Sequence, residues 1–251
     1  MTGPASPPFF KMKFNESLGK DVLGLTELRN KQKIIEPSKL WITSALTGRN
    51  KQGKCEDQGG GVTIMMSPRM STKIHDSGYV GTRIAWVRLK GPICPIFFIV
   101  AYIPHKFRKE SPFAHETIEQ LETLLKSVPK NDCIVLCGDF NCQLRRNVEG
   151  YTGKWCMTSR DEKKGHDQQV LTLMRQYDLF AVDTRFKPPR RSWFDGKSRR
   201  CNATYLSKHQ GKRPSKLNYF LVSNKCISSE TGLIYVYHMS VYTYMCIIYV
   251  Q

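Results

Sequence analysis

The start of the sequence, MTGPASPPFFKMKF, lacks the apolar segment of a secretory signal. We therefore expect a reducing, intracellular setting, in the nucleus or the cytoplasm. The nine cysteines also lack the spacing of a zinc site, because no histidine pair follows Cys133, Cys137 and Cys142 at zinc-finger distances. This absence excludes a zinc finger there and predicts thiols buried in a core.

Acidic residues are scarce in this chain. The 251 residues include 21 Asp and Glu against 39 Lys and Arg, which gives a formal net charge of +18 and an isoelectric point near 9.6. Such an excess of positive charge favours polyanionic partners, namely nucleic acid or an anionic membrane surface. A protein that is merely basic is the alternative that charge alone leaves open.

Charged residues are absent from the final segment, residues 233–250, which reads LIYVYHMSVYTYMCIIYV. Its length is just enough for a membrane span, so a tail anchor is one alternative. The many tyrosines, with His238, dilute its hydrophobicity, and we expect no membrane partner. We interpret residues 226–251 as a non-homologous apolar tail, prone to β aggregation if exposed. At the other end, residues 1–19 are proline-containing and predict a disordered or truncated leader.

Short apolar runs separated by Gly and Pro predict strands. They are rich in Ile, Val and aromatic residues, and they occupy residues 21–27, 61–67, 84–91, 95–104, 133–138 and 180–184. Apolar residues recur at helical spacing in 111–128, where Ser111 is the expected N-cap, and again in 165–179. This order predicts an α/β protein with sheets and helices in layers.

A basic segment covers residues 185–216. It holds eleven Lys and Arg and a single acid, Asp195, with Trp193 and Tyr205 among the charges. This mixture is typical of surfaces that neutralise phosphates while aromatic rings meet sugars or bases. The predicted nucleic-acid-binding residues are Arg190, Arg191, Arg199, Arg200, Lys212 and Arg213. A solvated linker is the alternative.

Polar residues follow three of the apolar runs directly. Glu27 ends the first, Tyr102 the run at 95–104, and Asp139 with Asn141 the run at 133–138. If these strands end at one edge of a layered sheet system, the side chains converge where α/β proteins usually bind ligands. Each residue alone has a simpler explanation as part of a turn or a core.

Five motifs together resemble the endonuclease/exonuclease/phosphatase superfamily: TEL at 26–28, GGGVTIMMS at 59–67, AYIP at 101–104, GDFN at 138–141 and LNYFLVS at 217–223. Within it they resemble most the apurinic/apyrimidinic-type endonuclease domains of non-LTR retrotransposons and their craniofacial development protein-like relatives. The resemblance covers a domain at 20–225. It implies a four-layered α/β sandwich, two packed sheets flanked by helices, which we expect to be incomplete at both ends.

The resemblance also implies roles for the strand-end residues. Glu27 matches the glutamate that holds a divalent metal, usually Mg²⁺, with Mn²⁺ as the alternative. Asp139 matches the aspartate that orients or deprotonates the attacking water, and Asn141 matches the amide that bonds to the phosphate region. Tyr102 matches a tyrosine whose phenol contacts the phosphate.

Three departures from the family pattern predict impaired catalysis. Asn218 stands where the family has an aspartate that orients a catalytic histidine, and no Ser-Asp-His box follows Ser223. The first strand of the family, with its metal-site asparagine, is also missing before Glu27. Because such groups act as a unit, we expect weak or absent hydrolysis.

Three hypotheses result. The leading one is a metal-dependent DNA endonuclease of retroelement origin, impaired in this copy. The second is a protein that binds nucleic acid without cleaving it, and the third is the same fold acting on RNA or a phosphomonoester. The basic segment favours a polymer, and the resemblance favours DNA over RNA.

Overall fold

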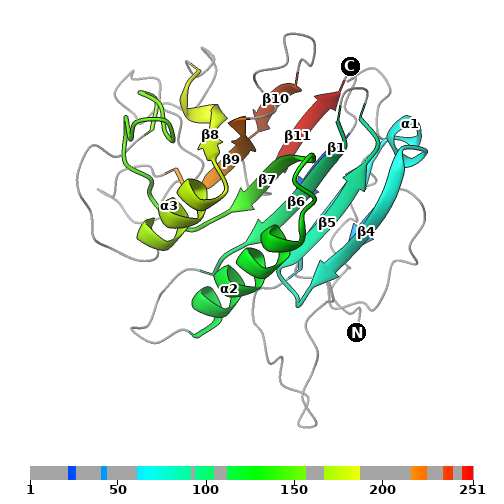
Figure 1. Ribbon diagram of the computed structural model, residues 1–251, viewed down its shortest axis with the longest axis horizontal. Coiled ribbons are helices and arrows are strands. Elements are labelled where there is room, and N and C mark those ends of the chain that lie inside the picture. The colour runs from blue at the N-terminus through cyan, green and yellow to red at the C-terminus, as the bar shows by residue number, and fades with distance from the viewer. Residues whose placement is uncertain are drawn as a thin grey trace, which may run out of the picture.

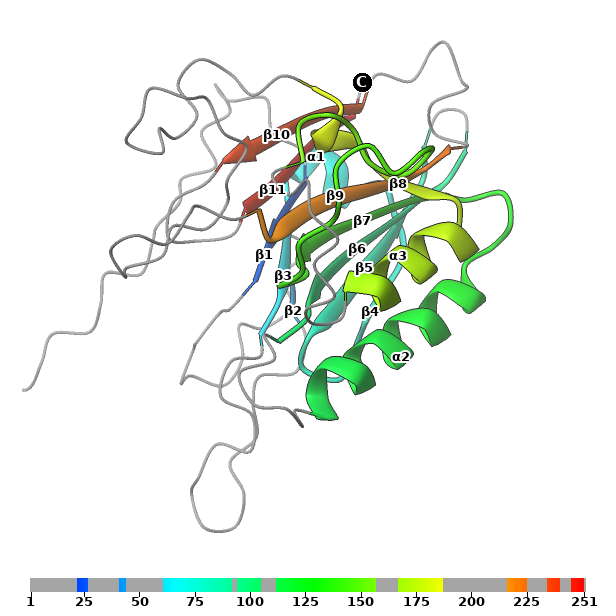
Figure 2. The same ribbon diagram turned by 90° about the vertical axis from the view of Figure 1, so that its left-hand side faces the viewer.

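Two sheets and two long helices make up the described part of the chain. The structure is a computed structural model that describes residues 22–26, 41–43, 61–91, 94–104, 112–156, 167–186, 216–224, 234–239 and 245–250. The sheets pack face to face, and the helices α2 (Pro112–Ser127) and α3 (Asp167–Gln176) lie on the outer face of the larger sheet (Figures 1 and 2). The predicted α/β class is confirmed, whereas the fourth layer stays a prediction.

The larger sheet has six strands in the order β4-β5-β6-β7-β9-β8. Their bounds are β4 Ile74–Val80, β5 Ile84–Leu89, β6 Ile96–Tyr102, β7 Cys133–Asp139, β9 Asn218–Ser223 and β8 Leu179–Ala181. Neighbours pair antiparallel except β6 and β7, which are parallel because α2 carries the chain back between them. A short 3₁₀ helix, η2 (Val182–Thr184), follows β8.

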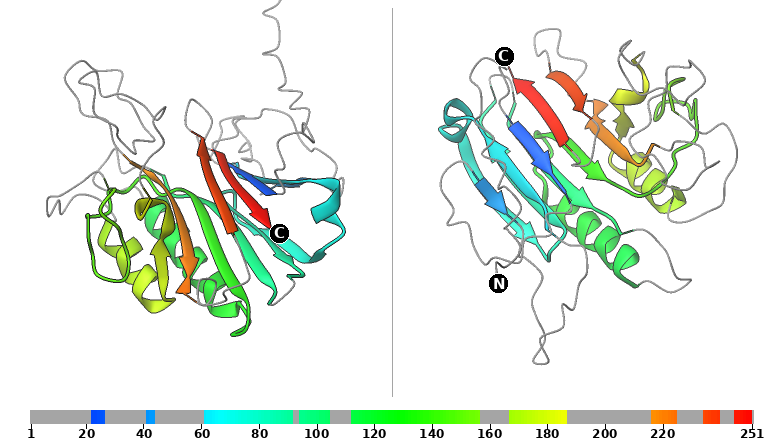
Figure 3. Two further views of the ribbon diagram at one scale, coloured as in Figure 1. Left: turned by 90° about the horizontal axis from the view of Figure 1, so that it is seen from above. Right: turned by 180° about the vertical axis from the view of Figure 1, so that it is seen from behind.

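The smaller sheet has five strands in the order β10-β11-β1-β3-β2, which Figure 3 shows from above and from behind. Their bounds are β10 Ile234–Met239, β11 Met245–Val250, β1 Val22–Leu25, β3 Thr63–Met66 and β2 Trp41–Thr43, and α1 (Pro68–Ser71) follows β3. All neighbours pair antiparallel, and β11 pairs directly with β1.

The described residues of the predicted tail, 226–251, are thus strands of this sheet. A run rich in Ile, Val and Tyr suits a pleated sheet surface. Within the described residues, no helix is long and apolar enough to cross a membrane. The domain boundaries, including the leader at 1–19, stay predictions.

The strands β6 and β7 are buried on both faces, which explains their unbroken apolar sequence. One face packs against the smaller sheet through Val100 and Cys137, and the other packs against the helices through Ile99 and Leu136. The apolar positions predicted for α2 and α3 form their buried faces. The expected N-cap Ser111 lies outside the described residues.

Buried thiols occupy both cores, as predicted, with one exception. Cys137, Cys142 and Cys156 are buried and keep their thiols. The prediction is wrong for Cys133, which is disulfide-bonded. Sequence spacing could not show this, because a disulfide depends on which cysteines the fold brings together. The redox compartment stays a prediction.

Gly138 permits the close approach of β7 to β6. Its φ is +144°, and a Cβ there would overlap the carbonyl oxygen of Ala101. We predict that Gly138→Ala lowers the free energy of unfolding by about 3–5 kcal/mol, from backbone strain plus overpacking. Gly150→Ala is the matched control, because φ is +78° there and nothing lies within 4 Å of the added Cβ. Denaturant melts of both variants check this, and equal losses would contradict it.

Burial of Cys156 predicts a loss of stability at high pH. Burial, more than the nearby charge of Asp183, raises the pKa of this thiol from 9.0 to about 11. The folded state therefore holds the proton longer than the unfolded state. The resulting stability is present below pH 9 and is lost as the pH rises towards 11, by about 2–3 kcal/mol. Denaturant melts from pH 8 to pH 11 measure it, and Cys156→Ala should lose less stability over the same range.

Candidate active site

Three predicted site residues lie side by side where the strands end. In the sheet register, Tyr102 at the end of β6 is opposite Asp139 at the end of β7, and Asp139 is opposite Asn218 at the start of β9. All three are buried, with 8%, 1% and 3% of their surface exposed. We call them the strand-end row.

The strand-end row faces the smaller sheet. Val100, Cys137 and Phe220 lie two residues from its members on the same strands, and they belong to the core between the sheets. Because side chains two residues apart share a face of a strand, the row has the same orientation. Directly opposite residues on neighbouring strands have Cβ atoms roughly 5 Å apart. A phenol, a carboxylate and an amide are therefore gathered at one edge.

Asn141 lies in a tight turn beside the row. Its φ is +46°, a left-handed conformation that asparagine tolerates better than most residues. Its backbone N–H donates to Asp139 Oδ1 at 2.9 Å, and its side-chain Nδ2 donates to the carbonyl oxygen of Ile103 at 2.9 Å. The GDFN sequence thus folds into a turn that orients the Asp139 carboxylate.

The turn is also bonded to both neighbouring strands through the backbone. The N–H of Ile103, just after β6, donates to the carbonyl oxygen of Asp139 at 2.8 Å. The N–H of Phe140 donates to the carbonyl oxygen of Leu217, just before β9, at 3.0 Å. The Asp139 carboxylate therefore lies in a rigid setting, as a positioned catalytic or ligand group requires.

Glu27 lies outside the described residues, one position after the buried Thr26. In the described ranges, no group of three or more His, Cys, Asp or Glu side chains is arranged to hold a metal. The described donors are nevertheless of the type that Mg²⁺ prefers. Asp139 offers carboxylate oxygens and Asn218 an amide oxygen, and Mg²⁺ needs only one or two protein carboxylates because it keeps several waters.

The described histidines do not join the row. His75 and His115 are exposed on β4 and α2, and His238 lies in β10 of the smaller sheet. His115 pairs with Glu119 at 3.2 Å. None of the three is opposite Asp139 in the register of the described strands.

Exposed cations follow the turn closely, and they are not among the predicted binding residues. Arg145, Arg146 and Lys154 are exposed on the loop 145–156, and Arg185 is exposed next to it. The sequence signal for Arg145 and Arg146 is the QLRR run at 143–146, one residue after GDFN, which stands out less than the dense basic segment at 185–216. The residues predicted there, Arg190, Arg191, Arg199, Arg200, Lys212 and Arg213, lie outside the described residues.

The loop 145–156 is held firmly against η2. Gly153 N donates to Thr184 Oγ1 at 2.7 Å, and Trp155 N donates to the Thr184 carbonyl oxygen at 3.0 Å. Arg185 Nη2 donates to the carbonyl oxygen of Gly150 at 3.3 Å. The exposed cations therefore lie near the strand-end row, on a loop that hydrogen bonds hold in place.

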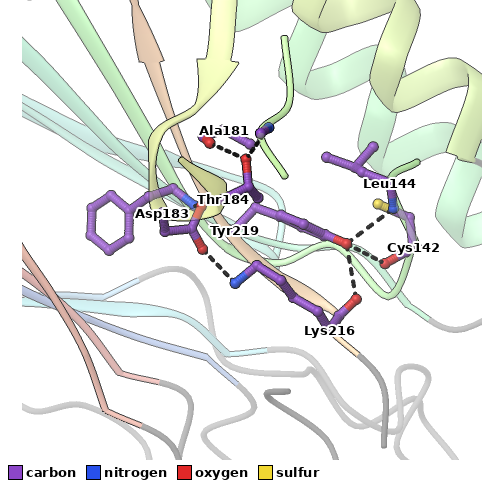
Figure 4. Close-up of polar contacts among 9 residues, drawn as sticks. Cys142, Leu144, Ala181, Asp183, Thr184, Lys216 and Tyr219 are labelled. Atoms are coloured by element: carbon purple, nitrogen blue, oxygen red, sulfur yellow. Dashed lines mark hydrogen bonds and ion pairs between the residues drawn. The ribbon is translucent and has the colours of Figure 1, made fainter. Parts of the chain in front are cut away.

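A buried ion pair lies next to the start of β9, where Lys216 precedes the strand. Lys216 Nζ is 2.5 Å from Asp183 Oδ2, and the Lys216 side chain is completely buried (Figure 4). By sequence Lys216 belongs to the basic segment, but its burial removes it from the surface. Tyr219 lies next to it, and burial raises the pKa of its phenol well above the ordinary value, so the phenol keeps its proton.

No family model matches the sequence, but solved structures share its fold. The 3′ phosphatase NExo from Neisseria, bound to a product DNA hairpin, is 13% identical, with 92% of this chain and 89% of that chain covered and a TM-score of 0.55. An AP endonuclease from Archaeoglobus fulgidus is 14% identical, with 94% and 91% covered and a TM-score of 0.53. An endonuclease/exonuclease/phosphatase family protein from Leptotrichia buccalis is 12% identical, with 92% and 87% covered and a TM-score of 0.50.

A curated relative matches part of the sequence. Craniofacial development protein 2 of Bos taurus is 24% identical over 132 residues, which is 52% of this chain and 22% of that protein. The match therefore spans less than a quarter of the relative's length. Together with the solved structures, it agrees with the resemblance carried by the GDFN, AYIP and LNYFLVS motifs. The predicted resemblance is confirmed at the level of the fold: the chain has the α/β fold of these endonuclease/exonuclease/phosphatase structures.

Proposed function

We propose that this protein is a divalent-metal-dependent phosphodiesterase that nicks DNA, of retroelement origin and with a reduced rate. The observation that carries the proposal is the strand-end row, which gathers Tyr102, Asp139 and Asn218 beside the Asn141 turn. The fold shared with NExo, solved with a product DNA hairpin, and with an AP endonuclease supports a nucleic acid substrate. The charge of +18 supports it too.

Each residue of the site has a chemical role in this proposal. The Asp139 carboxylate orients the attacking water and accepts its proton. The phenol of Tyr102 donates to the phosphate, where negative charge develops, and Asn141 fixes the turn that holds Asp139 in place. Glu27 holds the metal, Mg²⁺ or Mn²⁺, which when bound neutralises charge on the phosphate and the leaving oxygen.

Asn218 is the reason to expect a reduced rate. An amide opposite Asp139 can form hydrogen bonds, but it cannot supply the negative charge that a carboxylate would give to a protonated histidine. Loss of a general acid or base typically costs about 10²–10⁴-fold in rate. Slow nicking is therefore consistent with the proposed site.

Nucleic-acid binding without cleavage is the second candidate function. Four exposed cations near the row favour it independently of catalysis, namely Arg145, Arg146, Lys154 and Arg185. Described residues hold thirteen Lys and Arg against ten Asp and Glu, so most of the net charge lies in the rest of the chain, which includes Arg190 to Arg213. Binding by these cations would neutralise phosphates of DNA in preference to a small phosphomonoester.

Cleavage is tested with supercoiled plasmid and purified protein. We predict slow nicking that needs Mg²⁺ or Mn²⁺ and falls at least about 100-fold in Asp139→Asn and in Glu27→Gln. Asp76→Asn is the matched control, because Asp76 is exposed on β4 and should nick at the wild-type rate. Nicking that persists in chelator, or in Asp139→Asn, would show that the activity does not come from this site.

Binding is tested separately, in chelator, by fluorescence anisotropy of labelled DNA at several salt concentrations. We predict that Arg145→Gln with Lys154→Gln lowers the slope of log Kd against log salt by about one for each phosphate that these cations neutralise in the wild type. Lys90→Gln with Lys130→Gln removes the same charge at the opposite ends of the strands and should leave the slope unchanged.

The predicted basic segment needs its own variant. Changing four of its arginines to Ala together should weaken DNA binding at low salt, namely Arg190, Arg191, Arg199 and Arg200. If neither this variant nor the loop variant changes the salt slope, binding through these cations is wrong.

A further inference from the structure

One tyrosine links two of the three chain segments that form the strand-end row. Tyr219 follows Asn218 on β9, and its side chain lies on the helix-covered face, in the core with Phe140, Cys142 and Leu144. Its ring meets the ring of Phe140 edge to face, with centroids 6.2 Å apart. Tyr219 is therefore packed against the residue immediately after Asp139.

The Tyr219 hydroxyl also bonds to the backbone on both sides. It accepts the N–H of Leu144 at 3.0 Å and donates to the carbonyl oxygen of Lys216 at 2.9 Å, with the Cys142 carbonyl oxygen at 3.4 Å (Figure 4). Leu144 and Cys142 follow the GDFN turn, whereas Lys216 precedes β9. One phenol thus fixes the distance between the turn and the start of β9.

The Lys216–Asp183 ion pair holds the other end of this link. Asp183 Oδ1 accepts the backbone N–H of Phe220 at 3.3 Å, so the carboxylate contacts β9 and also Lys216 just before it. The Lys216 ammonium also lies 5.1 Å from the centre of the Tyr219 ring. The pair is buried, so removing either partner would leave an uncompensated buried charge. Lys216 is therefore a firm acceptor for the phenol.

Asn141 depends on both of its neighbours. It lies between Phe140 and Cys142, and it keeps the left-handed conformation that gives Asp139 Oδ1 its backbone donor. Tyr219 contacts the residue on either side of it. If the phenol were removed, the turn would lose its support towards β9, and the Leu144 N–H would be buried without that acceptor.

We propose that Tyr219, supported by the Lys216–Asp183 pair, is a positioning residue that sets the Asp139–Leu144 segment and so the orientation of the Asp139 carboxylate. Its effect on catalysis rests on the proposed function, whereas its effect on the turn does not. The role differs from that of Asn218, which lies in the row itself on the other face of the same strand.

The test compares Tyr219→Phe with the matched control Tyr177→Phe. The Tyr177 hydroxyl donates to the Glu122 carbonyl oxygen at 3.2 Å, between the end of α3 and α2, so the control also removes a phenol hydrogen bond. Amide hydrogen exchange by NMR is read at Asn141 and Leu144. We expect it to be about ten-fold faster in Tyr219→Phe and unchanged in the control.

Single-turnover and steady-state nicking in Mg²⁺ provide the second readout. For Tyr219→Phe we expect kcat to fall about ten-fold while KM stays within about two-fold, because a misplaced carboxylate slows the chemical step more than binding. The control should keep both values. A general loss of stability would instead affect the two variants alike.

Four outcomes contradict the proposal or separate it from the proposed function. Equal exchange at Asn141 and Leu144 in the two variants overturns it, whatever happens to cleavage. Faster exchange with an unchanged kcat overturns its catalytic part. If the wild type does not cleave, the proposed function fails and exchange alone decides the role of Tyr219. If Tyr219→Phe does not fold, amide hydrogen exchange in the wild-type protein tests the proposal instead. The proposal is overturned if the Leu144 amide exchanges much faster than the amide of Leu136, which lies in the middle of β7.

Discussion

The parallel pairing of β6 with β7 is the constraint on which the rest of the structure depends. Both strands are buried on both faces, so their backbone groups must pair with each other. That pairing fixes the register in which Tyr102 lies opposite Asp139. A one-residue shift would place Asp139 in the helix-covered core, where burial of a carboxylate is unfavourable. The apolar packing of the core therefore determines the geometry of the polar edge.

The edge keeps buried polar residues because the backbone around them is held from both sides. The turn forms hydrogen bonds to the chain next to β6 and next to β9 through Asp139, Phe140 and Asn141. Tyr219, which lies beside the Lys216–Asp183 pair, bonds to the residues that follow the turn. Such a setting suits a site that must present one carboxylate in one orientation. The same strand, β9, supplies the amide in the row and the phenol behind it, since neighbouring residues point to opposite faces.

Much of the fold could be predicted from local patterns, and the features that could not be predicted have a common cause. Six of the strands, the two helices and the strand-end position of Asp139 followed from apolar runs and periodicity. Lys216 belongs to the basic segment by sequence but is buried in an ion pair, and Cys133 was predicted to be a thiol but is disulfide-bonded. Residues 234–250 include two sheet strands. Each of these depends on a partner far away in the sequence.

The residue types at the strand ends could be known from the amino-acid sequence, because a strand buried on both faces is continuously apolar and the GDFN motif shows where β7 ends. The absence of a carboxylate at position 218 also follows from the sequence, because Asn218 remains an amide in any fold. The fold was needed to show that Tyr102, Asp139 and Asn218 form one row and that Tyr219 links the turn to β9. The physical reason is register: side chains from strands far apart in sequence become neighbours only when backbone pairing fixes which residues lie opposite each other.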